Sequence, residues 1–399
     1  MQALKPTLQP LPERSSSSSS SSTLSPPAPA TAAPELATAT GGVATLESTM
    51  DAYAQRHAEM LRGERPLRAI VYVCSGTLQC GGWGDRLKGI MFAFLFGILT
   101  NRSIFLHYDK GGGNLTDIYD TNRVNWLHTR AVTPDGARTH DPARGIDMVW
   151  CVNVNTYICS RDLLSRKKPI VRIHHNAFEA QILLGHPRLR GVAKRLGLST
   201  RRDLLSVMYD FLFKPKPELQ ALIDKTEAKV RGAGDIMVGM HIRIGGEKLV
   251  SGKRTDRSNN KGTDRAKDDP KRVSFDQIPK FSKCATMLKK FFIEKQKMTY
   301  FIATDNEKAM RFLTVQPKFT AAHIGQLGHS EKSTYDIKNA MRMHLEFELL
   351  RRSDWLIMSP SGFGAFAALT GNVHMAIDYN KCRYAWRYYG EGQGVSTCC

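Results

Sequence analysis

Residues 68–108 read RAIVYVCSGTLQCGGWGDRLKGIMFAFLFGILTNRSIFLHY, and this stretch decides the fold class. Its first eight residues, RAIVYVCS, are rich in β-branched and aromatic side chains, which favour a strand. The segment 85–101 is a long apolar run that ends at Asn101, which predicts a buried helix, and SIFLHY predicts a second strand. A strand, a helix and a second strand in this order predict a βαβ unit with parallel strands.

The same alternation continues along the chain. KKPIVRIHH predicts another strand, and helical patterns follow over 201–213 and 217–230. A second series then alternates strands with helices, over 236–244, 278–296, 299–305, 306–315, 319–325, 335–352, 354–360, 362–370 and 372–378. We therefore predict an α/β protein of two Rossmann-like domains with parallel sheets, whose ligands lie beyond the carboxyl ends of the strands.

Changes in composition predict the domain boundaries. Residues 1–45 contain eight consecutive serines and then Pro, Ala and Thr, a composition typical of a disordered tail. We expect residues 46–66 to form a linker or short helix. Residues 67–232 and 233–399 are then the N-terminal and C-terminal Rossmann-like domains.

The chain is strongly basic, with a net charge of +20, which indicates an anionic partner. A nucleic acid, a membrane surface and a nucleotide diphosphate all satisfy this. Much of the charge falls in residues 248–272, which are poor in apolar residues and typical of a solvated loop. No nucleic-acid recognition motif accompanies it, so we expect no nucleic-acid partner.

The cysteines and sequons bear on the cell compartment. None of the eight cysteines has C-x-x-C spacing, which argues against a structural zinc site. The pairs Cys74/Cys80 and Cys151/Cys159 are either disulfides of a secretory lumen or buried free thiols, and two Asn-x-Ser/Thr sequons begin at Asn101 and Asn114. We see no signal peptide and expect no membrane span in this chain, so an anchor for a secretory-pathway enzyme would lie outside it.

The turn after the first strand is rich in glycine. Gly81, Gly82 and Gly84 allow a tight turn and a close backbone approach to a ligand, and the N-terminus of the following helix favours an anion. The competing interpretation is a tight turn without a ligand. Asp85 would then be a helix-start residue.

Polar residues stand at three strand ends of the second series. His241 and Arg243 are predicted on the same side of a strand, and an Arg there can bind a diphosphate with two parallel hydrogen bonds. The alternative for Arg243 is a surface ion pair. Asp305 ends the next strand, where it either accepts hydrogen bonds from a nucleotide or caps the helix that follows.

A third strand end carries hydroxyl groups. Ser359, Ser361 and Gly362 stand between a strand and an apolar helix, where hydroxyls and free backbone N–H groups can form a phosphate cradle. An N-capped core helix is the alternative. Because three such strand ends fall in one domain, we expect their side chains to converge on one ligand. We find no Asp-x-Asp metal motif at a strand end and predict no metal site.

These segments resemble motifs of the fucosyltransferases, including the plant xyloglucan-type, nodulation-Z and α-1,6 enzymes. The resemblance covers about residues 68–378. The glycine-rich turn and its helix resemble one family motif, and YDFLFKPKPELQALI resembles a Phe-Lys/His-Pro segment of the plant group. HIRIGG resembles the family's His-x-Arg motif, and FIATDN resembles its Ala-Thr-Asp strand end. SDWLIMSPSGFG resembles the family's serine turn.

The resemblance implies a GT-B fold whose C-terminal domain binds GDP-fucose as donor substrate, while the N-terminal domain faces the acceptor. It implies an inverting, metal-independent enzyme without a cofactor, acting on a glycan or glycoprotein in the Golgi or secretory lumen. Arg243 would bind the β-phosphate and support the departing GDP, His241 would sit beside the nucleotide, and Asp305 near the guanine or ribose. Ser361, Gly362 and Phe363 would lie along the diphosphate.

The chain also departs from the family pattern. Asp85 stands where Asn is usual, Trp83 where Leu or Phe is common, and HIRIGG lacks the second Arg of the α-1,6 motif. The acceptor and linkage therefore stay open. Asp85 and Glu247 are the candidates for the general base. The alternative functions are a catalytically silent glycan- or nucleotide-binding relative and a basic nucleic-acid-binding protein.

Overall fold

The structure is a computed structural model, and most of the chain after residue 43 is described in it. The described residues are 44–75, 80–108, 114–127, 146–150, 169–174, 176, 178, 180–198, 202–244, 273–292, 296–316, 318–325 and 336–384. The predicted disordered tail, residues 1–45, lies outside this part except for its last two residues. The first element is helix α1 (Leu46–Leu61), whose N-terminus is capped by the Thr45 side chain.

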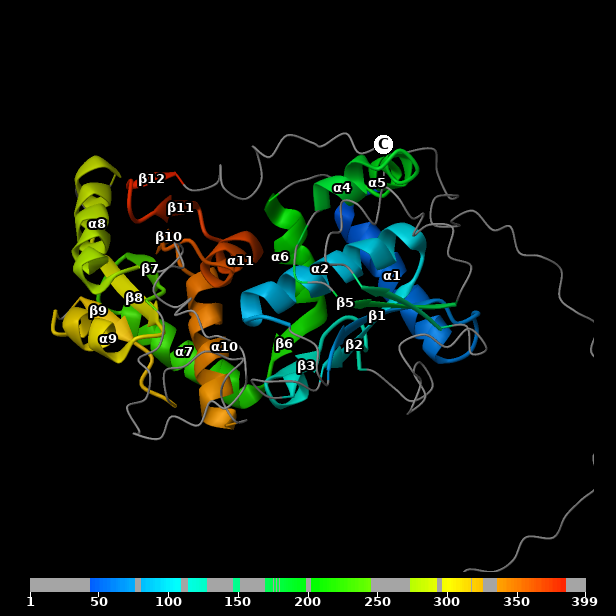
Figure 1. The fold of residues 1–399 in the computed structure, drawn as a ribbon, viewed down its shortest axis with the longest axis horizontal. Coiled ribbons are helices and arrows are strands. Elements are labelled where there is room, and N and C mark those ends of the chain that lie inside the picture. Colours follow the sequence, from blue (N-terminus) through cyan, green and yellow to red (C-terminus); the bar gives the residue numbers. More distant parts are fainter. Residues whose placement is uncertain are drawn as a thin grey trace, which may run out of the picture. The chain divides into compact units, whose positions relative to one another are not determined.

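A parallel sheet of four strands follows, in the spatial order β2-β1-β5-β4 (Figure 1). All six residues of its strand β1 are buried, as expected for a parallel strand covered on both faces. Helix α2 (Trp83–Thr100) connects β1 to β2, which confirms the predicted βαβ unit. The bounds are β1 (Ala69–Cys74), β2 (Ser103–Tyr108), β4 (Ile146–Trp150) and β5 (Ile170–His174).

The second sheet has six strands in the order β12-β11-β10-β7-β8-β9. All are parallel except β12, which pairs antiparallel with β11. Strand β7 is the first strand of this sheet along the chain. Strands β8 and β9 follow on one side of it, and the chain then returns to form β10 and β11 on the other side. The order therefore reverses between β7 and β10, the place where Rossmann-like sheets bind ligands. The bounds are β7 (Ile236–Ile242), β8 (Met298–Thr304), β9 (Phe319–Ala321), β10 (Trp355–Met358), β11 (Met375–Asp378) and β12 (Arg383–Tyr384).

Helices cover both faces of the second sheet (Figure 1). Along β7 the side chains alternate: Val238 and Met240 pack in one hydrophobic cluster with α8 and α9, whereas Met237 packs in another with α10 and α11. The second cluster continues into the core of the first sheet, because α11 packs against α2 and α6. These helices are α6 (Arg202–Leu212), α7 (Pro217–Arg231), α8 (Ile278–Phe292), α9 (Glu307–Thr314), α10 (Ile337–Arg351) and α11 (Gly362–Thr370).

Several short elements complete the described chain, and we did not predict them. A two-stranded antiparallel pair joins β3 to β6, two short helices precede α6, and single 3₁₀ turns occur before β3 and α8. The described residues from 44 onward belong to one compact unit, and the division at 232/233 stays a prediction. The bounds are β3 (Tyr119–Thr121), β6 (Phe213–Pro215), α4 (Ala180–Gly185), α5 (Arg190–Arg195), η2 (Leu115–Asp117) and η5 (Phe275–Gln277).

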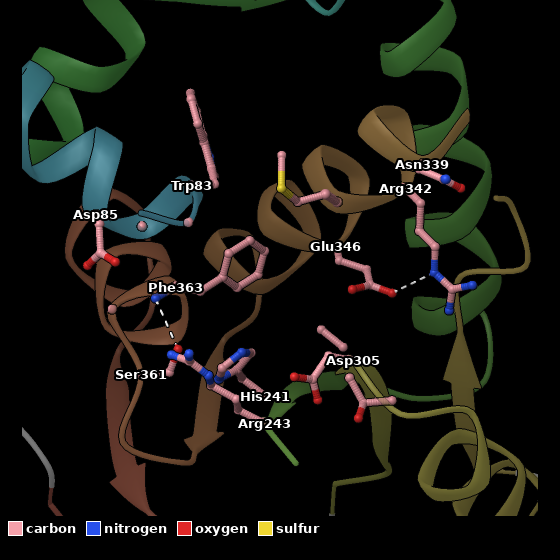
Figure 2. A pocket seen from close by; sticks show the side chains of 16 residues that line it. Trp83, Asp85, His241, Arg243, Asp305, Asn339, Arg342, Glu346, Ser361 and Phe363 are labelled. Carbon is pink, nitrogen blue, oxygen red and sulfur yellow. Dashed lines mark hydrogen bonds and ion pairs between the residues drawn. The ribbon is translucent and has the colours of Figure 1, made fainter. Parts of the chain in front are cut away.

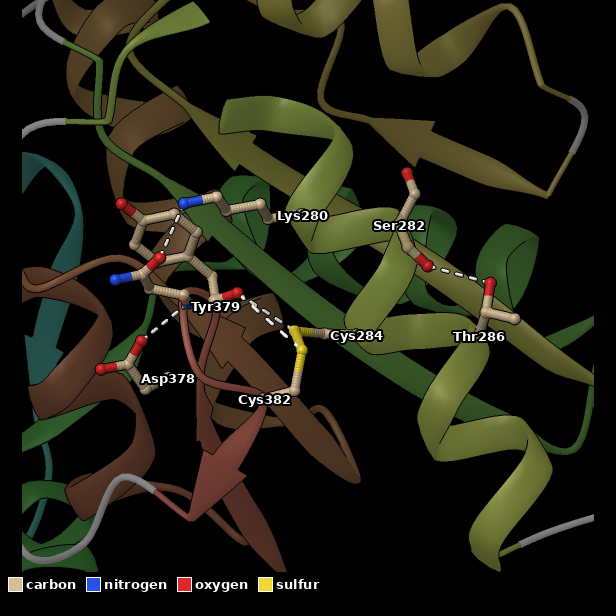
Figure 3. Close-up of a disulfide and its surroundings, with 8 residues drawn as sticks. Lys280, Ser282, Cys284, Thr286, Asp378, Tyr379 and Cys382 are labelled. Atoms are coloured by element: carbon tan, nitrogen blue, oxygen red, sulfur yellow. Dashed lines mark hydrogen bonds between the residues drawn. A yellow bond between two sulfur atoms is a disulfide. The ribbon is translucent and has the colours of Figure 1, made fainter. Parts of the chain in front are cut away.

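Two disulfides cross-link the described residues. Cys74–Cys80 joins the end of β1 to the glycine-rich turn, so the disulfide alternative is confirmed for this pair. Cys284–Cys382 links α8 to the segment after β11 (Figure 3). We did not predict this disulfide from the sequence. The predicted pair Cys151/Cys159 lies outside the described residues. In the part of the chain that is described, no helix has the length and apolar character needed to cross a membrane.

Candidate functional site

A pocket that opens to solvent lies where the second sheet meets α2 (Figure 2). The carboxyl ends of β7 and β8, the N-termini of α2 and α11, and one side of α10 line it. It therefore lies at the place where the strand order reverses. Of the residues predicted for the site, those lining the pocket are Gly82, Gly84, Asp85, His241, Arg243, Asp305, Ser361, Gly362 and Phe363.

The remaining predicted residues do not line the pocket. Gly81 lies in the turn before α2, where its φ of +71° explains the need for glycine. Ser359 is fully buried behind the pocket, so its hydroxyl supports the backbone instead of facing a ligand. Glu247, the second candidate base, lies outside the described residues.

Arg243 directly follows β7. We expected it within the strand, but pairing with β8 ends at Ile242. The backbone leaves the ladder there because side chains bind its next two N–H groups: Arg243 N donates to Ser359 Oγ at 3.1 Å, and Ile244 N donates to Asp305 Oδ1 at 2.9 Å. Arg243 is thus held by its backbone while its half-buried side chain lines the pocket.

His241 lies under the first turn of α11. Its ring stacks on Phe363, with centroids 5.4 Å apart, and a Cβ on Gly364 would lie 2.9 Å from its Nδ1. Burial, together with the charge of Arg243, lowers the pKa of His241 to about 3. The imidazole is therefore neutral at physiological pH and supports the position of α11.

The N-termini of α2 and α11 meet at the pocket. Gly82 caps α2 without a side-chain hydrogen bond, and Ser361 caps α11, its Oγ accepting from Phe363 N at 3.3 Å. A Cβ on Gly84 would lie 2.4 Å from the backbone carbon of Gly362, so the helices touch backbone to backbone. Two helix N-termini beside Arg243 create a strongly anion-attracting end of the pocket, which we call the anion end.

Asp85 is the acidic residue of the anion end. It lies in the first turn of α2, its side chain is 40% exposed, and its Oδ1 pairs with Lys88 Nζ at 2.8 Å. A Cβ on Gly362 would lie 2.8 Å from that Nζ, so the ammonium group is packed against the start of α11. The pair places a carboxylate at the pocket without leaving an uncompensated negative charge.

The other end of the pocket carries two carboxylates and a guanidinium group. Asp305 follows β8, but the cap of α9 is Asn306, whose Oδ1 accepts from Ala309 N; the capping alternative for Asp305 is therefore wrong. Glu346 on α10 pairs with Arg342, with Nε and Oε1 3.0 Å apart. We call Asp305, Glu346 and Arg342 the carboxylate end.

The sequence did not reveal Glu346, Arg342 or their helical neighbour Asn339, which also lines the pocket. A Glu four residues after an Arg occurs on many exposed helix faces, so the spacing alone carries little signal. Burial raises the pKa of Glu346 to about 7, although the nearby Arg342 acts in the opposite direction.

A buried polar network fixes the wall behind the pocket. Trp83, the first residue of α2, packs edge-on against His344 of α10 at 4.5 Å between ring centroids. Tyr209 donates to Glu348 Oε1 at 2.7 Å, and Arg351 pairs with Glu348 Oε2 at 2.9 Å. This network joins α10 to α2 and α6, so the two ends of the pocket are held on rigid elements. Within the described residues, no group of His, Cys, Asp or Glu has the arrangement to hold a metal ion.

Comparison with known proteins places this site in a known fold. No protein-family model and no curated protein sequence matches the chain. Among solved structures, a mutant of FUT1 from Arabidopsis thaliana in complex with GDP matches with a TM-score of 0.56 and 14% identity, over 83% of this chain and 78% of that one. The protein therefore has a GT-B fold, which confirms, at the level of the fold, the resemblance drawn from the motifs.

Structures of the fucosyltransferase NodZ also match, at lower similarity. NodZ co-crystallised with GDP has a TM-score of 0.43 and 15% identity, over 78% of this chain and 94% of that one. NodZ from Bradyrhizobium has a TM-score of 0.43 and 16% identity, over 79% and 96%.

Proposed function

We propose that the protein is a glycosyltransferase that moves L-fucose from GDP-fucose to a glycan or glycoprotein, inverting the anomeric centre. The observation that supports this most strongly is the anion end: Arg243 and the N-termini of α2 and α11 line one end of one pocket. FUT1, which shares the fold, was solved with GDP, and NodZ was solved with GDP and soaked with GDP-fucose.

The donor diphosphate would bind at the anion end. The guanidinium group of Arg243 offers a fork of N–H donors to phosphate oxygens, and the backbone N–H groups of Ser361 and Gly362 at the start of α11 offer further donors. This arrangement supplies fixed positive charge without a metal ion or a cofactor. We therefore expect activity to be metal-independent.

Transfer would proceed as a single displacement. The acceptor hydroxyl oxygen attacks the anomeric carbon of fucose from the face opposite the diphosphate, and the bond from that carbon to the β-phosphate oxygen breaks. Its electron pair leaves with GDP, and Arg243 stabilises the charge that develops on the phosphate. The proton of the acceptor hydroxyl needs a base, and the candidate is Asp85, which lies in the first turn of α2 with its Oδ1 3.2 Å from a Cβ built on Gly362.

The compartment is also a proposal. Disulfides persist in oxidising compartments, and Cys74–Cys80 and Cys284–Cys382 therefore support a secretory lumen, with the Golgi as the expected site for glycan modification. Asn101 caps α2 in the left-handed conformation, while Asn114 is exposed, so Asn114 is the better candidate for N-glycosylation.

A donor panel tests the proposed function. The protein is incubated with GDP-fucose, GDP-mannose, UDP-galactose, UDP-N-acetylglucosamine and CMP-sialic acid, with and without a mixture of glycan acceptors, and nucleotide release is measured. We expect release from GDP-fucose alone, stimulated by acceptor. Binding of GDP without turnover would instead indicate a catalytically silent relative, and stabilisation by short DNA but not by GDP would indicate a nucleic-acid-binding protein.

A further inference from the structure

The anion end contains a carboxylate whose charge opposes that of its proposed ligand. Asp85 lines the pocket from the first turn of α2, and in Figure 2 it lies on the same side of the view as Ser361 and Arg243. A diphosphate at the start of α11 would bring its own negative charges to this place. Like charges repel strongly where water is partly excluded, so the charge of Asp85 has to be offset for the ligand to bind.

The carboxylate group of Asp85 lies between two glycines. A Cβ built on Gly81 would lie 2.6 Å from Asp85 Oδ2, and a Cβ built on Gly362 would lie 3.2 Å from Asp85 Oδ1. The carboxylate therefore occupies the space that side chains at positions 81 and 362 would need. It lies at the contact between the turn before α2 and the first residue of α11, beside the backbone N–H groups proposed to bind the diphosphate.

Lys88, three residues further along α2, pairs with this carboxylate. Its Nζ lies 2.8 Å from Asp85 Oδ1, and a Cβ built on Gly362 would lie 2.8 Å from the same Nζ. The Lys88 side chain is only 22% exposed, because the start of α11 covers it. An ion pair on an open helix face contributes little, whereas this pair lies at the contact of two helices and reaches the pocket.

We propose that Lys88 is a positioning residue of the donor site: it holds the Asp85 carboxylate between α2 and α11 and cancels its charge, so that a diphosphate can bind beside it. This rests on the proposed function, because it takes a diphosphate at the anion end as given. Lys88 does not line the pocket and acts through Asp85, which does. The same pair keeps the candidate base in one orientation.

Two other roles for the pair predict different effects of substitution. An ion pair that only supports the fold would change the stability of the protein and leave GDP affinity unchanged. An ammonium group that binds phosphate directly would be missed whether or not Asp85 is charged. A lysine that cancels the charge of Asp85 predicts a reversal of sign: GDP affinity falls without Lys88, rises without the charge of Asp85, and returns when both charges are removed.

The test is a double-mutant cycle on the full chain, with GDP dissociation constants measured by calorimetry and folding checked by thermal unfolding. Lys88→Met should bind GDP about tenfold more weakly, because an unpaired carboxylate then faces the diphosphate. Asp85→Asn should bind GDP about threefold more tightly, a smaller change because the unpaired ammonium group lies further from the ligand. The variant with both substitutions should bind GDP within about threefold of the wild type, because the net charge of the pair is again zero.

Two control variants separate charge from shape. Lys88→Arg keeps the positive charge and should retain most of the GDP affinity. Arg311→Met removes the same charge from an exposed ion pair of α9, in which Arg311 lies 2.9 Å from Glu307. This variant should leave GDP affinity unchanged, because its side chain is 77% exposed and lies outside the pocket.

Each outcome bears on the proposal or on the function beneath it. A folded Lys88→Met with wild-type affinity overturns the role of Lys88, and so does a double variant that binds GDP as weakly as Lys88→Met. If Lys88→Met does not fold, Asp85→Asn decides alone, and equal or weaker GDP binding by that variant overturns the proposal. In these cases the proposed function stands. If the wild type does not bind GDP, the proposed function itself fails.

Discussion

Replacing Arg243 with alanine should nearly abolish transfer while leaving the fold intact. The backbone at this position is held independently of the side chain: Arg243 N donates to Ser359 Oγ at 3.1 Å, and its carbonyl oxygen accepts from Val273 N at 2.8 Å. The side chain makes its contribution in the pocket. Truncation should therefore change the chemistry more than the stability.

The expected loss of turnover depends on the stage of the reaction at which negative charge develops on the leaving phosphate. In the bound donor the diphosphate charge is shared among Arg243 and the N-termini of α2 and α11. In the transition state additional negative charge builds on the leaving phosphate, so the contribution of Arg243 grows. Removal of one such donor costs about 10²–10³ in turnover, or about 2.7–4 kcal/mol. GDP affinity should fall less, by about tenfold.

The assay combines initial rates of fucosyl transfer, GDP dissociation constants and thermal unfolding. Arg243→Lys should restore little activity, because a single ammonium group cannot reproduce the planar fork of donors. Arg311→Ala, which removes an exposed arginine of α9, should retain full activity and serves as the matched control. Near-normal turnover by a folded Arg243→Ala would show that the diphosphate binds elsewhere.

Four further predictions concern stability, pH, the disulfide and metals. Gly84→Ala should destabilise the protein by about 1–3 kcal/mol, because its Cβ would lie 2.4 Å from backbone, whereas Gly185→Ala, with nothing within 4 Å, should change the melting temperature little. GDP affinity should fall as pH drops below about 7, since the raised pKa of Glu346 leaves less of its carboxylate, which lines the pocket, ionised to accept hydrogen bonds; Glu346→Gln should lack this pH dependence, and identical pH profiles would contradict it. The Cys284→Ser/Cys382→Ser variant should lose about 4 kcal/mol in denaturant unfolding, because the disulfide closes a loop with a sequence separation of 98; an unchanged midpoint would show that the bond does not form. Transfer should continue in EDTA, and its loss with rescue by manganese would refute the metal-independent mechanism.

The sequence predicted the parallel core of the fold well, because buried strands and core helices are long apolar runs. Helix α11 begins and ends at the predicted residues, and α2 begins two residues before the predicted start at residue 85. The short antiparallel pair of β3 and β6 has three residues in each strand, too few for a periodic pattern. Tertiary pairing, not local preference, creates such elements.

The anion end could be predicted because its residues follow predicted strands, and parallel sheets bind ligands beyond the carboxyl ends of their strands. The carboxylate end could not. Glu346 lies within the predicted helix 335–352, for which the sequence indicated no face towards a ligand, yet packing between the sheets buries Glu346, Glu348 and Arg342 of that helix. Which helix faces a pocket depends on how the sheets assemble, and one-dimensional spacing does not encode this. The same limit explains why Cys284–Cys382, between distant segments, was not foreseen.

The position of bound GDP tests the account most directly, and a crystal structure of the full chain soaked with GDP would measure it. We predict the β-phosphate within about 3 Å of the Arg243 guanidinium group and of the backbone N–H groups at the start of α11. The guanine or the ribose should then lie beside Asp305. GDP bound outside this pocket, or with its base at the anion end, would contradict the account.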